Sequence, residues 1–256
     1  MFTSFNQTFI LNGAVQAIEG FQWLEPFPFL SVADALCALT ASLFLRNQYK
    51  GYMHGIPLFV CTFLMCFGGS TFTSIVHGQM LGYLRRSIGF ISYLICTVSI
   101  TLLPQSVVDS LFKNSLFQLF FFLTEALLRV HCVTSWGVDT AIRSNGSVVS
   151  ATFGSIATGC GGGFLASLLL DDMKGSWMDK VTRALMTRKQ EIEHLLTLSL
   201  CYQCAIGFIP LPFITPIHPV TAKSLCFTLF LFLYGIEHLF GLRLFIPIPF
   251  QASYSE

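Results

Sequence analysis

Charge is scarce in this sequence. Asp, Glu, Lys and Arg make up 11% of its 256 residues, whereas soluble domains carry about 25%. Hydrophobic residues make up 54%, and the formal net charge is +1, without a polybasic segment. A net charge near zero without a run of basic residues excludes a basic tail that binds nucleic acid. The scarcity of charge and the high hydrophobic content indicate an integral membrane protein.

Signatures of enzymes and metal proteins are missing too. The sequence has no His/Glu/Asp metal spacing, no nucleophile elbow and no phosphate-binding loop. Its nine cysteines lie mostly inside apolar runs, without paired CxxC blocks of zinc spacing. We therefore expect a protein that is not an enzyme and holds neither a metal nor a covalent cofactor. The first residues also lack the basic region and cleavable apolar core of a signal peptide.

Long apolar runs, in contrast, recur along the whole chain. A membrane-spanning helix needs about 20 predominantly apolar residues, and prolines fall at or near the ends of the runs, where a missing N–H does least harm. We expect a single all-α domain, 1–256, with seven transmembrane helices. The predicted spans are Phe27–Leu45, Ile56–Val76, Ile88–Leu103, Leu116–Trp136, Val148–Leu170, Leu195–Ile214 and Thr221–Leu242.

The distribution of basic residues predicts the orientation of these spans. With residues 1–25 outside, the inner loops hold most of the Lys and Arg residues, and the tail 243–256 lies in the cytosol. The outer loops then carry only Arg85, Arg86, Arg143 and Lys223. The glycosylation sequons at Asn6 and Asn145 both fall outside.

Two of the predicted spans have glycines at their centres. Gly159–Gly163 contains four glycines and Gly68–Gly69 two, although each glycine costs a helix about 1 kcal/mol relative to alanine. Such clusters either let another backbone approach closely or let the helix unwind along a water-filled path. Aligning Gly68–Gly69 with Gly161–Gly162 also aligns Ser74 with Ser167.

This alignment predicts an inverted repeat. Residues 27–103 and 107–214 each hold three spans, and the second span of each triplet contains the glycines. Because three is odd, the second triplet enters the bilayer from the opposite side. We expect glycine-broken second and fifth helices that meet at a pseudo-twofold axis in the membrane plane, with 221–242 as a seventh helix outside the repeat.

On these residues the chain resembles the TRIC family, the trimeric intracellular cation channels of endoplasmic and sarcoplasmic reticulum. The resemblance runs from Phe27-Pro28-Phe29 to the last span. Its most specific pieces, in order, are Cys66-Phe67-Gly68-Gly69, Gly137-Val138, Asn145-Gly146, Gly159-x-Gly161-Gly162 and Lys174-Gly175-x-Trp177.

The resemblance implies a homotrimer with one pore per subunit, in the reticulum membrane or the adjoining nuclear envelope. It implies K⁺ as the permeant ion, counter-ion flux during Ca²⁺ release, and a luminal N-terminus. The pore would run beside the second and fifth helices. The residues assigned to the pore or its kinks are Gly68, Gly69, Ser70, Thr158, Gly161, Gly162 and Gly163.

The sequence also departs from the family pattern. The family's Lys-Glu-Val-x-Arg segment, whose basic residues hold a phosphoinositide, here keeps Arg129 but has Glu125 at the lysine position. Thr158 stands where a basic residue usually precedes the glycines, and an acidic-plus-His pattern appears as Ser31 and Asp34. The scaffold therefore matches, while the lipid-binding and gating chemistry is partly replaced.

Ionisable residues inside spans cost roughly 2.5–3.5 kcal/mol each and so indicate function. Glu125 and Arg129 share a helix face. Either they face the pore, with Arg129 binding an anionic lipid and Glu125 attracting cations, or they form an ion pair that only makes insertion tolerable. Asp34 and Asp139 are assigned to a polar groove.

Three functions remain open at this point. The first is a K⁺ channel, the second a non-conducting TRIC-like protein that assembles with or regulates channel subunits, and the third a small-solute transporter. The polar stretch 177–194 is equally open, because its mixed charges and apolar residues fit either a helix on the cytosolic membrane surface or a solvated loop.

Overall fold

The computed structural model describes residues 32–50, 53–85, 87–170, 177–213 and 215–240. The predicted luminal segment 1–25 with Asn6, Ser31 at the start of the first span, Lys174 and Gly175 of the resemblance, and the tail 243–256 lie outside these residues. Throughout the described part the regular structure is helical, which confirms the all-α class.

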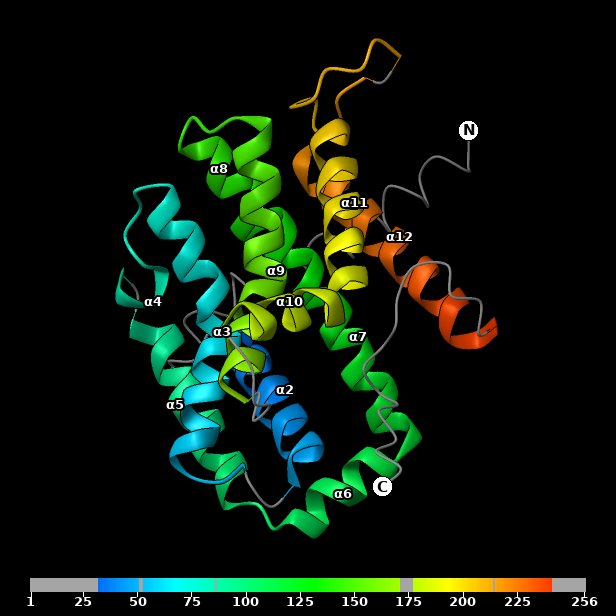
Figure 1. Ribbon diagram of the computed structural model, residues 1–256. Helices are drawn as coiled ribbons and strands as arrows, with labels where there is room; N and C mark the ends of the chain where they lie inside the picture. Colours follow the sequence, from blue (N-terminus) through cyan, green and yellow to red (C-terminus); the bar gives the residue numbers. More distant parts are fainter. Residues whose placement is uncertain (1–31, 51–52, 86, 171–176, 214, 241–256) are drawn as a thin grey trace.

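Two groups of three long helices lie side by side, joined by shorter ones (Figure 1). The first group is α2 (Val32–Gln48), α3 (Ile56–Val76) and α5 (Ser87–Leu102), and the second is α7 (Ser115–His131), α9 (Val148–Leu170) and α11 (Lys189–Ala205). α7 continues through a π-helical turn, η2 (Cys132–Val138), into α8 (Asp139–Arg143). The remaining helices are α4 (Gly82–Arg85), α6 (Gln105–Lys113), α10 (Trp177–Thr187) and α12 (Pro219–Phe240).

Three described helices are long and apolar enough to cross a membrane: α3, the continuous helix 115–143, and α9. α5 and α6 pass the same test as one span, but they are bent by 100° at Pro104, which cannot continue a helix. The chain is therefore a multi-pass membrane protein. α2, α11 and α12 occupy the other predicted spans without passing this test along their described residues, so the count of seven stays a prediction.

Two predicted ends are wrong. The fourth span runs beyond Trp136 to Arg143, through η2 and α8. The sixth helix begins at Lys189 and ends at Ala205, well short of Ile214. It ends there because Gly207 has a φ of 76°, a left-handed conformation that closes helices.

The glycine clusters do not break their helices. α3 and α9 run as continuous α-helices through Gly68–Gly69 and Gly161–Gly163, so the expectation of broken helices is wrong. The glycines instead let the two backbones touch where the helices cross. A Cβ atom on Gly69 would lie 2.9 Å from Thr158 Cα, and one on Gly161 would lie 3.3 Å from Gly69 Cα. Close approach, rather than unwinding, explains the clusters.

The contacts at this crossing are reciprocal under the alignment of Gly68–Gly69 with Gly161–Gly162. Exchanging the two helices turns each of the backbone contacts named below into another of them, as a local twofold axis requires. The equivalence of the two complete triplets stays a prediction. The reciprocal contacts are Gly68 against Gly162 and Gly161 against Gly69, together with Gly69 against the Ala157 and Thr158 carbonyls and Gly162 against the Leu64 and Met65 carbonyls.

Hydrogen bonds reinforce the crossing. The buried Thr73 hydroxyl of α3 lies 3.2 Å from the Gly154 carbonyl oxygen and 2.9 Å from the Thr158 hydroxyl of α9. Thr158 also donates to its own helix at the Gly154 carbonyl, at 2.6 Å. Small residues and hydroxyls of this kind stabilise helix pairs in membranes.

A buried arginine fastens α2 to the bend between α5 and α6. Arg46 is fully buried, and its Nη1 donates to the carbonyl oxygens of Ile100 and Leu103 at 2.5 and 2.6 Å. Its Nη2 donates to Gln105 Oε1 at 3.1 Å. Pro104 has no N–H to donate to the Ile100 carbonyl, so Arg46 supplies a donor there beside the Leu103 N–H, which lies 3.2 Å from the same oxygen.

We expect Arg46→Ala to lower the free energy of unfolding by about 2 kcal/mol. The substitution removes hydrogen bonds from a charged group and leaves buried carbonyl oxygens without that donor. Thermal unfolding of the purified protein in detergent measures this loss. Lys113→Ala is the control, because Lys113 is an exposed basic residue at the end of α6. Equal melting temperatures for the two variants would contradict the role of Arg46.

Candidate functional site

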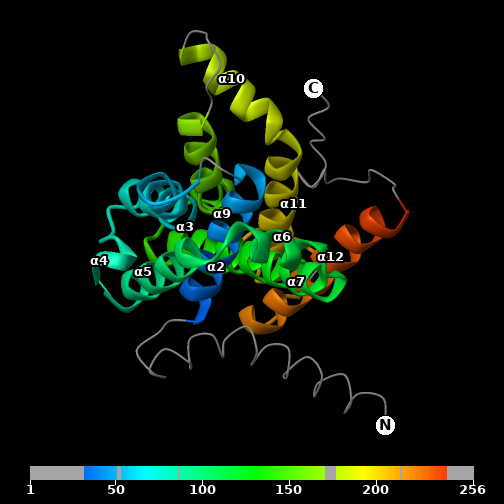
Figure 2. The same ribbon diagram turned by 90° about the horizontal axis from the view of Figure 1, so that it is seen from below.

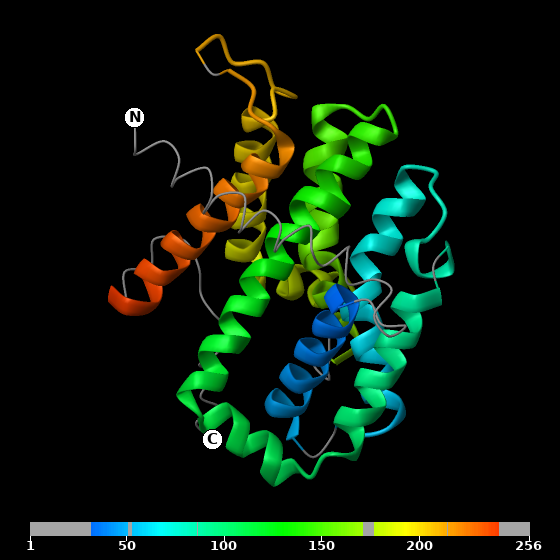
Figure 3. The same cartoon turned by 180° about the vertical axis from the view of Figure 1, so that it is seen from behind.

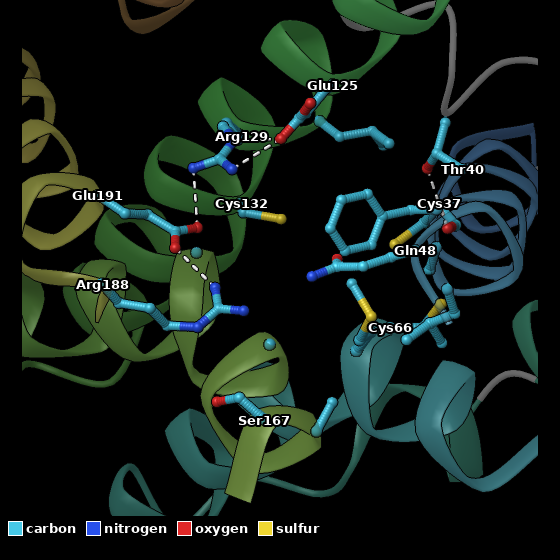
Figure 4. A pocket seen from close by; sticks show the side chains of 18 of the residues that line it. Cys37, Thr40, Gln48, Cys66, Glu125, Arg129, Cys132, Ser167, Arg188 and Glu191 are labelled. Carbon is cyan, nitrogen blue, oxygen red and sulfur yellow. Dashed lines mark hydrogen bonds and ion pairs between the residues drawn. The ribbon is translucent and has the colours of Figure 1, made fainter. Parts of the chain in front are cut away.

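A cavity of about 300 Å³ lies beside the crossing of α3 and α9 (Figure 4). Its walls come from α2, α3, α7, α9 and α11, with single residues from η2 and α12 and with Thr187 and Arg188 from the junction of α10 and α11. Residues from both groups of three helices line the cavity. They include Cys37, Gln48, Cys66, Glu125, Arg129, Thr158, Gly163, Ser167, Arg188 and Glu191.

One wall of the cavity carries four ionised side chains, which we call the charged network: Glu125, Arg129, Arg188 and Glu191. Arg129 Nη2 lies 2.7 Å from Glu125 Oε1, and its Nη1 lies 2.8 Å from Glu191 Oε1. Arg188 Nη1 lies 2.6 Å from Glu191 Oε2. Glu191 therefore bridges two arginines that belong to different helical segments, as the dashed lines of Figure 4 show.

Local structure places each member of the network. Glu125 and Arg129 are one turn apart on α7, and Glu191 lies in the first turn of α11, where a carboxylate suits the helix dipole. Arg188 packs on a glycine of α9, because a Cβ atom on Gly163 would lie 2.6 Å from Arg188 Nη1. The absence of a side chain at Gly163 thus makes room for the guanidinium.

The network is electrically balanced, with two carboxylates and two guanidiniums. Glu191 accepts hydrogen bonds from both arginines, so positive charge opposes its carboxylate on two sides. Mutual pairing offsets part of the cost of placing four charges inside the protein.

The facing wall is weakly polar. Figure 4 shows Cys37, Thr40 and Gln48 of α2 and Cys66 of α3 across the cavity from Glu191. The Thr40 hydroxyl donates to the Leu36 carbonyl of its own helix at 2.7 Å. The cavity thus has an ionic side built by the second half of the chain and a thiol, hydroxyl and amide side built by the first.

The structure brings only part of the predicted pore set to the cavity. Thr158 and Gly163 line it, together with Glu125 and Arg129. Ser70 donates to the Phe67 carbonyl of its own helix at 3.1 Å. The other predicted pore residues lie at the helix crossing: Gly68, Gly69, Gly161 and Gly162.

The two aspartates assigned to a polar groove do not line this cavity, and they contact different helices. Asp34 lies in the first turn of α2 against Gly89 of α5, where a Cβ atom would be 2.6 Å from Oδ2. Asp139 accepts a hydrogen bond from the Tyr202 hydroxyl at 2.8 Å and pairs with Lys223 Nζ at 2.7 Å. Asp139 thereby ties α8 to α11 and α12.

Sequence reasoning missed two members of the network. Arg188 and Glu191 fall in the stretch interpreted as a surface helix or loop, although their spacing of three residues suits an ion pair on one helix face. Their position just before an apolar run was the available signal. Within the described residues, no group of three or more His, Cys, Asp or Glu side chains is arranged to hold a metal ion.

No protein-family model matches the sequence, and no curated protein matches it at a significant level. Among solved structures, the chain is similar to a trimeric intracellular cation channel from C. elegans, determined with bound Ca²⁺. The two share 16% sequence identity with a TM-score of 0.60, over 89% of this chain and 97% of that chain. At this identity the likeness shows the fold: the chain has a TRIC-like fold.

Proposed function

We propose that this chain is a TRIC-type cation channel that conducts K⁺ through the cavity beside the α3–α9 crossing. The observation that carries the proposal is the charged network, since ionised side chains facing a cavity inside an otherwise apolar membrane protein mark ion pathways. The shared fold supports it. Counter-ion flux during Ca²⁺ release, in a reticulum membrane with the N-terminus luminal, is the physiological role we propose.

The network suggests how conduction would be controlled. Glu125 and Glu191 supply the negative charge that favours a cation, while Arg129 and Arg188 neutralise it in the arrangement observed. A passing K⁺ needs carboxylate oxygens turned away from the guanidiniums. We therefore assign the observed pairing to a non-conducting state of the pore.

The same arginines bear on the proposed lipid ligand. A phosphoinositide headgroup is an anion that guanidinium binds well, but Arg129 is already paired with Glu125 and Glu191. We propose that such a headgroup binds by competing with Glu191, which would free that carboxylate for cations. The homotrimer is likewise proposed, from the trimeric state of the C. elegans channel.

Planar-bilayer recording on the purified protein tests the proposal. We expect unitary K⁺ currents from the wild type, and we expect Glu125→Gln to reduce them because the network loses a negative charge. Lys189→Gln is the matched control, because that residue is exposed and pairs with Glu193 at only 3.9 Å. The absence of any current from bilayers that contain correctly folded protein would contradict the proposed channel function.

A non-conducting TRIC-like protein is the second candidate. The observation that favours it is the balance of the network, in which two carboxylates pair with two guanidiniums among the described residues. It predicts current only after Glu125→Lys restores the family's basic residue, and then only with anionic lipid. K⁺ flux without unitary steps would instead support a small-solute transporter.

A further inference from the structure

Helix α10 turns its four largest apolar side chains away from the protein. Trp177, Met178, Leu185 and Met186 are 64%, 68%, 45% and 69% exposed. On the opposite side of the helix, Ala184 is buried and Lys180 and Arg183 are half-buried. Lys180 and Arg183 therefore lie toward the rest of the chain with Val181 and Ala184, while the large apolar side chains face outward, alongside the exposed Asp179 and Thr182.

The exposure of these apolar side chains is the opposite of what is expected for a helix on a surface in contact with water. A helix on an aqueous surface packs its apolar stripe on the core and exposes its charges. Figure 2 shows α10 at the edge of the bundle, projecting from the helices that make up the core. An outward apolar face at that edge requires apolar surroundings.

The surroundings that fit are the lipids at the bilayer interface. At 11 residues α10 is too short to span a membrane, and it lies between the spanning helix α9 and the start of α11. Trp177 at its first position is an interfacial residue. Lys180 and Arg183 along its charged side complete an amphipathic, interface-seeking helix.

α10 is joined directly to the charged network. The helix ends at Thr187, and the next residue, Arg188, pairs with Glu191 and rests on Gly163. Any change in the depth of α10 in the bilayer therefore moves the guanidinium of Arg188. We propose that α10 is a lipid-docked helix whose contact with the bilayer interface holds Arg188 in the network. The regulatory part of this inference rests on the proposed channel function, and the docking does not.

Docking is tested by fluorescence quenching. Trp23→Phe and Trp136→Phe leave Trp177 as the single tryptophan, and the protein is reconstituted in vesicles of phosphatidylcholine brominated either near the headgroup or deep in the acyl chains. We expect loss of most of the Trp177 emission with the shallow bromine, less with the deep bromine, and little quenching by aqueous iodide. Quenching by iodide alone would overturn the docking.

Two variants test which residues dock and whether docking reaches the pore. In the single-tryptophan background, Met178→Ser/Leu185→Ser/Met186→Ser should lose bromine quenching and gain iodide quenching. Met186→Ser alone should do so partially, which keeps the test valid if the triple variant folds poorly. Quenching unchanged in both variants would overturn the apolar face as the contact.

For the coupling, the triple variant and Arg188→Gln should each change K⁺ flux about fivefold in the same direction, and their combination should add nothing further. Additive changes, or a triple variant with wild-type flux, would overturn the coupling. If the wild type shows quenching but carries no K⁺ at all, the proposed channel fails while the docking stands, so the two failures are distinguishable.

Discussion

Replacing Glu191 with glutamine is expected to lower the free energy of unfolding by about 3 kcal/mol, because removing the shared partner of two half-buried ion pairs leaves uncompensated charge. Glu191 bonds to Arg129 and Arg188, so one substitution weakens two ion pairs. The network then carries a net positive charge beside the cavity. We therefore also expect the K⁺ current of the surviving folded protein to fall.

The matched control lies two residues further along the same helix. Glu193 is 45% exposed and pairs with Lys189 at 3.9 Å, and exposed pairs of this kind contribute little. Glu193→Gln should therefore melt within a few degrees of the wild type. Thermal unfolding in detergent compares the two variants, and equal losses would show that Glu191 does not organise the cavity.

The second large effect is expected at Gly162. Changing glycine to alanine within a helix normally stabilises it by up to about 1 kcal/mol. At Gly162, however, a Cβ atom would collide with the backbone carbonyls of Leu64 and Met65, which cannot move without separating α3 from α9. We expect Gly162→Ala to cost about 3 kcal/mol, the upper part of the range for overpacked sites, and to reduce the yield of folded protein.

Gly82→Ala provides the comparison, because nothing lies within 4 Å of a Cβ atom there. This variant should be neutral or slightly stabilising. Gly162→Ala should lower the unfolding temperature, whereas Gly82→Ala should leave it unchanged or raise it. A general effect of glycine on helix stability would change both unfolding temperatures in the same direction, so this difference identifies the backbone contact at Gly162. Size-exclusion profiles and unfolding temperatures measure both.

Local patterns in the sequence predicted the central helices well. α3 and α9 have the predicted bounds, Ile56–Val76 and Val148–Leu170, because each is an uninterrupted apolar run in the sequence. The meeting of their glycines was also predictable, since paired clusters of small residues in matching spans have a direct packing meaning. Whether such a cluster bends the helix or only lets a neighbour approach is decided by the partner helix, and the sequence prediction of a break was wrong.

The charged network illustrates what local patterns do not contain. The pairing of Glu125 with Arg129 follows from helical spacing, but the second partner of Arg129 is Glu191, which belongs to a distant segment. That contact depends on the packing of α7 against the start of α11. Likewise, the outward apolar face of α10 becomes visible only when the structure shows which side of the helix the protein covers.

The central claim, that K⁺ passes through the cavity lined by the charged network, is tested most directly by locating the ion. Thallium(I) replaces K⁺ and scatters X-rays anomalously, so crystals of the purified protein soaked in a thallium salt would show where it binds. We predict an anomalous peak inside the cavity, between the carboxylates of Glu125 and Glu191 and the α2 wall. Thallium bound only outside this cavity, in crystals where the carboxylates of Glu125 and Glu191 have turned away from the guanidiniums, would contradict the claim.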